Sequence, residues 1–224
     1  TLRRTRFGLL AWALGAASLT ALMAGLQPSV MEVWTDFDFV DAITGAGPGV
    51  DAQAAYWSFA GALISPVIAA YVVVQASAWT SELAQGRVEL LLAAPVSWPR
   101  LVLGRLLALV VGVLAITLTG LAALLAVAAA IDGRVDLAGL GRLTVIGVLF
   151  GAALGAVGAL LLVVVVRRAL AVTVLTSVVV ASYLLAYLVP MFGWPEWLDR
   201  LSVFWAFGQP YLQWPTGAML ATLL

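Results

Sequence analysis

Residues 80–105 read TSELAQGRVELLLAAPVSWPRLVLGR, a break between two strongly apolar runs that also carries several positive charges. Glu82, Gly86 and Glu89 recur at helical spacing and form one polar face, opposite leucine and valine side chains. Pro95 ends this pattern, because a proline pushes the residue before it out of the helical region. The stretch therefore predicts a short amphipathic helix, a stop, and the start of a second helix.

Arg100 and Arg105 stand at the start of the apolar run that follows. Long basic side chains at such a position extend to the charged headgroups of a lipid bilayer. We therefore expect the short helix to lie across the cytoplasmic ends of two membrane helices, where its charges are available to a docking protein.

The composition assigns the chain to a membrane. Hydrophobic residues make up 64% of the chain and charged residues 10%, and the mean hydropathy is +1.10. Soluble domains are about half apolar and about a quarter charged. A chain this apolar cannot hide its surface from water by folding on itself, so lipid is its expected solvent.

The residues that are missing exclude several kinds of chemistry. The sequence has no His, Cys or Lys, which removes disulfides, thiol nucleophiles, common zinc sites and histidine-based acid–base catalysis. A phosphate-binding loop needs a Lys, so the chain is not itself a P-loop ATPase. Asp36, Asp38 and Asp41 lack the spacing of a calcium-binding loop. We predict no catalytic residue, no metal site and no cofactor on this chain.

Apolar runs divide the chain into about six transmembrane helices, an all-α polytopic bundle. Residues 8–26 form a helix of about 28 Å, long enough to cross the hydrocarbon core. This basic-then-apolar start also resembles a signal peptide, but its length and the further spans favour a membrane helix. The other spans are 56–79, with a kink expected at Pro66, then 101–131, 143–166 and 169–190, and a truncated sixth that begins at 214.

Residues 191–213 are rich in aromatic side chains and are interrupted by Pro195 and Pro210. Tryptophan and tyrosine collect where a membrane meets water. The segment is therefore predicted to be a re-entrant or interfacial hairpin on the extracytoplasmic side.

The distribution of arginine predicts the orientation. With a cytoplasmic N-terminus, the outer segments hold only Arg134, Arg142 and Arg200. The inner segments then hold eight: Arg3, Arg4, Arg6, Arg87, Arg100, Arg105, Arg167 and Arg168. This excess follows the positive-inside rule. We expect the N-terminus and residues 80–100 to be cytoplasmic.

Two further patterns concern the membrane helices. Gly147, Gly151 and Gly155 stand four residues apart on one face of the fourth span, where small residues let two helices approach closely. We interpret them as a helix-packing surface. The interiors of the predicted spans carry no ionisable side chain, whereas ion-coupled transporters usually need such groups at membrane depth.

Residues 80–105 resemble the ABC-2 family of ABC transporter permeases. The family has an acidic residue, a Gly-Thr or Gly-Arg pair, Glu-x-Leu-Leu, a small residue, Pro-Val-Ser-Arg, and Gly-Lys at the next helix. This chain has Glu82, Gly86-Arg87, Glu89 before three leucines, Pro95-Val96-Ser97, and Gly104-Arg105. It departs from the pattern at Trp98-Pro99, which replace the Arg after the Ser, and at Arg105, which replaces the Lys. The opening of the chain also looks like one half of the two-half antibiotic or multidrug exporters of actinobacteria.

The resemblance implies a mechanism. A single transmembrane domain, 1–224, would be one half of a longer permease in a bacterial plasma membrane and would face a second half. A separate ATP-binding subunit would hold ATP and magnesium. Its coupling contacts would be Glu82, Gly86, Arg87, Glu89, Pro95, Ser97, Arg100 and Arg105. The expected cargo is hydrophobic or amphipathic, such as a drug, an antibiotic or a lipid, and no nucleic acid partner is expected. Two alternatives stay open: a secondary transporter or channel, and a membrane scaffold that does not transport.

Overall fold

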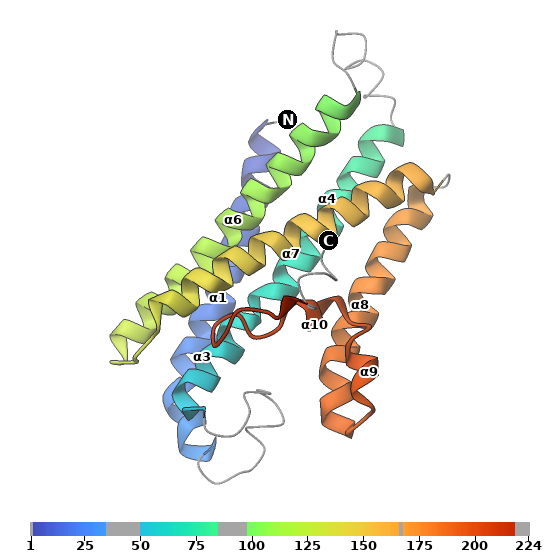
Figure 1. Cartoon of the computed structure of the whole chain (residues 1–224). Helices are drawn as coiled ribbons and strands as arrows, with labels where there is room; N and C mark the ends of the chain where they lie inside the picture. Colours follow the sequence, from blue (N-terminus) through green and yellow to red (C-terminus); the bar gives the residue numbers. More distant parts are fainter. Residues whose placement is uncertain (1, 35–49, 85–97, 166–167, 218–224) are drawn as a thin grey trace.

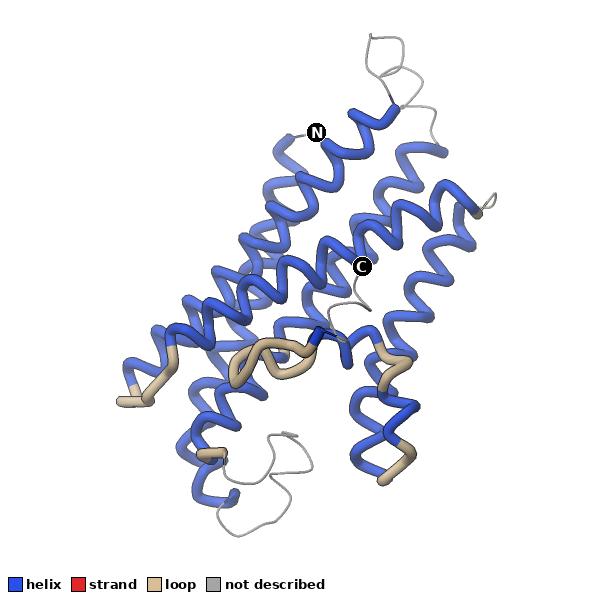
Figure 2. Tube along the Cα trace, viewed as in Figure 1, coloured by secondary structure: helices blue, strands red, loops and turns tan. Residues whose placement is uncertain are grey.

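The computed structural model describes residues 2–34, 50–84, 98–165 and 168–217. These residues form a bundle of helices, and no strand occurs among them (Figure 2). Five helical stretches are long and apolar enough to cross a membrane: Phe7–Glu32, Ala52–Ser81, Arg100–Ala130, Leu137–Leu162 and Leu170–Val189. The predicted all-α, polytopic membrane class is therefore confirmed. The predicted sixth span, apart from its first few residues, lies outside the described part of the chain.

The long helices run alternately in opposite directions along the bundle (Figure 1). The elements are α1 (Leu2–Trp34), α3 (Ala52–Ala62), α4 (Ile64–Ala84), α6 (Trp98–Ala130), α7 (Leu137–Val164), α8 (Arg168–Phe192), α9 (Glu196–Asp199) and α10 (Val203–Phe207). Helix α7 is central, because it packs against α4, α6 and α8, whereas α1 packs mainly against α6.

The first helix is longer than its apolar core. Its span was predicted over residues 8–26, but α1 continues to Trp34 and contains Pro28. At about 1.5 Å per residue, its 33 residues extend about 50 Å, more than a bilayer core needs. Residues 27–34, which follow the predicted span, are therefore an extension of α1.

The second span is broken at Leu63 and not at Pro66, where the kink was predicted. The Leu63 N–H bonds to the carbonyl oxygens of Gly61 and Phe59, which closes α3. Pro66 is the third residue of α4, so it stands in the first turn, where a helix makes no use of the missing N–H. The proline begins a new helix and does not bend an existing one.

The turn between the third and fourth spans is shorter than the gap between the predicted spans 101–131 and 143–166. Helix α7 already begins at Leu137, because the Asp136 carboxylate accepts hydrogen bonds from the backbone N–H groups of Ala138 and Gly139, both at 2.9 Å. Asp132 adopts a positive φ of 54°, a conformation that Asp tolerates better than most residues. Arg142 therefore stands in the second turn of α7 and not in the turn before it.

The buried core lies where α3, α4, α6 and α7 meet. Its fully buried members include Trp57, Ile68, Ile116 and Phe150. Large apolar side chains also cover the outside of the bundle, among them Leu103, Leu107 and Leu160, which are more than half exposed. Such an outer surface suits a solvent of lipid acyl chains and would be unstable in water.

Candidate functional site

The predicted coupling element joins the end of α4 to the start of α6. Glu82 lies in the last turn of α4, and Arg100 and Arg105 lie in the first turns of α6. Both helix ends are at the same end of the bundle as the start of α1 (Figure 1). The other predicted coupling residues, Gly86, Arg87, Glu89, Pro95 and Ser97, lie outside the described residues.

Several arginines belong to the helix termini at the end of the bundle where α1 begins. Arg3, Arg4 and Arg6 belong to α1, and Arg168 begins α8 next to the end of α7. The opposite end carries charges of both signs. It holds Asp51, Asp132, Arg134, Asp136, Arg142, Asp199 and Arg200.

The three glycines of α7 face α4 and α6. A side-chain carbon placed on Gly151 would lie 2.8 Å from a methyl carbon of Val113 on α6 and 3.0 Å from one of Ile68 on α4. The corresponding distances are 3.3 Å from Gly147 to Ile68 and 3.1 Å from Gly155 to Leu109. Side chains of α4 and α6 fill the space beside these glycines, so the three helices pack closely here.

A second close approach, between α1 and α6, has no strong signal in the sequence. The Thr20 hydroxyl of α1 lies 2.7 Å from the Gly120 carbonyl oxygen of α6 and 2.9 Å from the Ala16 carbonyl oxygen of its own helix. Gly120 has no side chain that would fill this contact, and Thr20 is fully buried. The threonine therefore joins two helices that are far apart in the chain.

Two other threonine hydroxyls of the spans bond within their own helices. Thr119 and Thr176 each donate to the carbonyl oxygen four residues earlier, at 2.7 Å and 2.8 Å. Such bonds satisfy a hydroxyl without a partner helix or a ligand. Thr117 differs, because its hydroxyl oxygen is buried beside Gly147 and has no hydrogen-bond partner among the described residues.

The aromatic segment after α8 folds back along the bundle. The Ser202 hydroxyl donates to the Ser182 carbonyl oxygen at 2.8 Å, and Ser182 lies ten residues before the end of α8 at Phe192. Ten helical residues correspond to about 15 Å, so the chain returns by this depth beside α8. At that level Phe204 and Phe207 pack against Phe150 of α7, each with ring centroids 5.4 Å apart.

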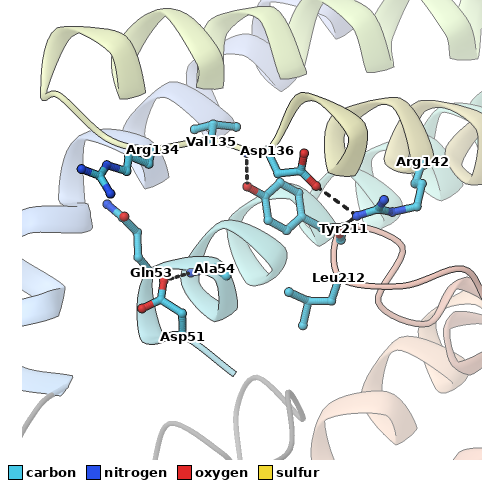
Figure 3. Close-up of a pocket in the computed structure, with 9 residues that line it drawn as sticks. All are labelled: Asp51, Gln53, Ala54, Arg134, Val135, Asp136, Arg142, Tyr211 and Leu212. Atoms are coloured by element: carbon cyan, nitrogen blue, oxygen red, sulfur yellow. Dashed lines mark hydrogen bonds and ion pairs between the residues drawn. The ribbon is translucent and has the colours of Figure 1, made fainter. Parts of the chain in front are cut away.

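After α10 the chain is hydrogen-bonded to the turn before α7 and to the start of α7 (Figure 3). The Tyr211 hydroxyl accepts a hydrogen bond from the Asp136 N–H at 2.8 Å. Arg142 donates to the Pro210 carbonyl oxygen at 3.0 Å, to the Tyr211 carbonyl oxygen, and to the Asp136 carboxylate at 3.2 Å. Burial is the main cause that raises the pKa of Tyr211 above its usual value of 10.0. Its hydroxyl is therefore uncharged at neutral pH and well suited to this contact.

These contacts form one wall of a pocket of about 570 Å³. The pocket lies between the start of α3, the α6–α7 turn and the chain after α10 (Figure 3). Its lining contains Asp51, Gln53, Ala54, Arg134, Val135, Asp136, Arg142, Tyr211 and Leu212. Neither the pocket nor its wall was predicted, because the residues come from three segments whose sequence pattern gives no sign that they meet.

Comparison with known proteins identifies the family. The whole chain, residues 1–224, matches the family model described as the C-terminal domain of the multidrug efflux system permease Rv1217c. No curated protein and no solved structure matches it. The five apolar helices agree with a multi-pass permease. The chain therefore belongs to the family of the C-terminal domain of multidrug efflux system permease Rv1217c.

Proposed function

We propose that the chain is the membrane-spanning component of an ATP-driven exporter of the ABC-2 type. It would move hydrophobic or amphipathic compounds, drug-like or lipid, across the bacterial plasma membrane. The observation that carries this proposal is the residue pattern at 80–105, which connects the ends of α4 and α6 in a member of a multidrug efflux permease family.

Residues 80–105 are positioned so that a force on this stretch would move the long helices. Helix α4 packs against α7 and α8, and α6 packs against α1 and α7. A force applied between the ends of α4 and α6 therefore reaches the other long helices. A docked subunit that closes on ATP and binds one arrangement of the bundle more tightly would shift the bundle toward that arrangement.

The energy source is expected on another chain. The sequence has no Lys and so no phosphate-binding loop of its own. ATP and magnesium would be held by the separate ATP-binding subunit, and a second permease half would complete the pathway. This chain would contribute part of the transport pathway and the coupling element, and would catalyse no reaction.

The charges of the spans favour an apolar cargo. In the four spans between Ala52 and Val189, the ionisable side chains other than tyrosine are Arg100, Arg105 and Arg142, all in the first turns of α6 and α7. Proton- or ion-coupled transporters usually carry such groups at the membrane centre. We therefore favour ATP-driven export over a secondary transporter or channel.

The proposed orientation places the N-terminus and residues 80–100 in the cytoplasm. The chain has no native Cys, so a single introduced cysteine gives an unambiguous signal. Ser81 and Gln213 are both exposed; Ser81 lies in the last turn of α4, and Gln213 follows Leu212, which lines the pocket with Asp51 and Arg134. We expect a membrane-impermeant maleimide to label Gln213→Cys in intact cells and Ser81→Cys only after lysis. The reverse pattern would contradict the orientation.

The proposal is tested by gentle purification of the permease from its native membrane, followed by mass spectrometry of the proteins that accompany it. A stoichiometric subunit with a phosphate-binding loop and an ATPase activity stimulated by candidate drugs is the expected result. A protein that purifies alone and transports without ATP would instead support a secondary transporter. Lack of transport with and without ATP would support a scaffold.

A further inference from the structure

The pocket beside Tyr211 has a second wall, which contains Asp51, Gln53 and Arg134. The charged groups of this wall have no ion-pair partner among the described residues. Among the residues that the structure describes, exposed Arg134 makes no hydrogen bond and no ion pair. Asp51 accepts a hydrogen bond from the Ala54 N–H with one carboxylate oxygen, at 3.2 Å, and its other oxygen has no partner in the described chain. Figure 3 shows the Gln53 side chain reaching toward Arg134. One positive and one negative group are therefore available on this wall.

The charged groups of the opposite wall already have partners. Both carboxylate oxygens of Asp136 accept hydrogen bonds, from Ala138, Gly139 and Arg142. Arg142 in turn is held by the two carbonyl oxygens of the returning chain. Because Asp136 and Arg142 already have partners, Asp51 and Arg134 are the charged groups available to a ligand.

The pocket lies at the level where a bilayer has its headgroups. Asp51 directly precedes the span that starts at Ala52, and Arg134 lies in the turn between the spans that end at Ala130 and start at Leu137. Apolar side chains of Ala54, Val135 and Leu212 line the same pocket. Such a boundary between charge and apolar surface matches the boundary between the headgroup and the acyl chains of a lipid.

We propose that this pocket binds the zwitterionic headgroup of a membrane lipid, with the phosphate at Arg134 and the ammonium at Asp51. A ligand with only negative charge would face the carboxylate of Asp51, and one with only positive charge would face the guanidinium of Arg134. A guanidinium forms strong, directional hydrogen bonds with phosphate. The volume of about 570 Å³ is in the usual range for a small-molecule site. This proposal does not depend on the ATP-driven mechanism.

The test uses the complete purified permease and phosphatidylethanolamine as the probe, with bound lipid counted by native mass spectrometry. Asp51→Asn keeps the helix cap of α3, because Asn caps as well as Asp, and removes only the charge. Arg134→Gln removes the opposite charge from an exposed side chain. We expect each variant to weaken lipid binding by about tenfold, in line with the loss of one charge-assisted hydrogen bond.

The control is Arg200→Gln, an exposed arginine at the same end of the bundle but outside the pocket, which should leave lipid binding unchanged. Unchanged binding in both pocket variants would overturn the proposal. Tighter binding of anionic phosphatidylglycerol to Asp51→Asn, with no loss of phosphatidylethanolamine, would also overturn it, because the pocket would then be a simple anion site. Equal binding of free phosphoethanolamine and of the lipid would exclude the bilayer as the source of the ligand.

Discussion

Gly151 illustrates how single residues decide the packing of α7. A methyl group at this position would lie 2.8 Å from Val113 and 3.0 Å from Ile68, closer than carbon atoms normally approach. We expect Gly151→Ala to lower the free energy of unfolding by about 1–3 kcal/mol, because the core is already full. Thermal unfolding in detergent, followed by the amount of monodisperse protein, measures the loss.

The matched control for this change is Gly141→Ala in the same helix. Nothing lies within 4 Å of a side-chain carbon built on Gly141. In the helix, Ala is favoured over Gly by roughly 0.5–1 kcal/mol. The control should therefore be neutral or slightly stabilising, and equal losses in both variants would show that helix packing is not the cause.

Asp199 gives a prediction that depends on pH. Burial raises the pKa of this carboxyl above its ordinary value of 3.8. The folded state therefore binds the proton more tightly than the unfolded state. The resulting stability is fully present below 3.8 and is lost as the pH rises through the raised pKa. At neutral pH the charged, half-buried carboxylate opposes folding.

We therefore expect Asp199→Asn to raise the melting temperature at neutral pH, because the amide removes the charge and keeps the shape. The advantage should shrink as the pH falls through the raised pKa of Asp199 and should vanish below it. Thermal unfolding of both proteins over that range measures the effect. A constant difference at every pH would mean that ionisation of Asp199 plays no part.

At the level of elements, the returning aromatic segment depends on Ser202. Its hydroxyl donates to Ser182 on α8 and accepts from the Phe204 N–H at 3.1 Å, which also caps α10. We expect Ser202→Ala to lower the opening free energy of residues 203–212 by about 1–2 kcal/mol, since the cap and the contact with α8 are both lost. Hydrogen exchange of the backbone amides in this segment is the measurement.

Thr119→Ala is the control for the serine variant. Thr119 is exposed and bonds only to its own helix, at Ala115. Its loss should leave exchange in residues 203–212 unchanged. If Ser202→Ala also left that exchange unchanged, the segment would be held by its aromatic packing alone.

The sequence predicted the helical class well and the helix ends less well. Apolar length alone predicts a membrane span. Helix ends depend on local caps, so α7 begins at Leu137 because of Asp136, and the break at Leu63 depends on how Pro66 fits a first turn. Neither effect is visible in the hydropathy of the chain.

The contacts of the returning segment were not predictable in this way. Phe204 meets Phe150, and Tyr211 meets Asp136, across more than fifty residues of chain. Hydrophobic periodicity reports on one element at a time and carries no information about such pairs. The glycine spacing of α7 predicts a packing face but carries no information about which helices occupy it.

For the whole molecule, the central prediction concerns Glu89 of the coupling element. Glu89→Arg reverses a charge on the polar face predicted to meet the ATP-binding subunit. We expect substrate-stimulated ATPase activity of the complex to fall by about tenfold, because like charges would then meet across the interface. Membrane insertion should be normal, as judged by the yield of folded protein.

A charge reversal at the other end of the bundle, Glu196→Arg in α9, serves as the control. It changes the net charge by the same amount but is far from the predicted docking surface. Wild-type ATPase stimulation in Glu89→Arg would contradict the coupling role. An equal loss in both variants would point to a general effect of charge.

The contact between Thr20 and Gly120 also sets a condition on how the protein is made. The two residues are 100 positions apart, so at about 5–20 residues per second a ribosome needs about 5–20 s to deliver the second after the first. During that delay α1 stands in lipid without its main neighbour, and an unsatisfied hydroxyl there would be costly. The Ala16 carbonyl oxygen, 2.9 Å away, can hold the proton of Thr20 until the Gly120 carbonyl arrives. The hydroxyl of Thr20 therefore has a hydrogen-bond partner in its own helix before α6 is inserted.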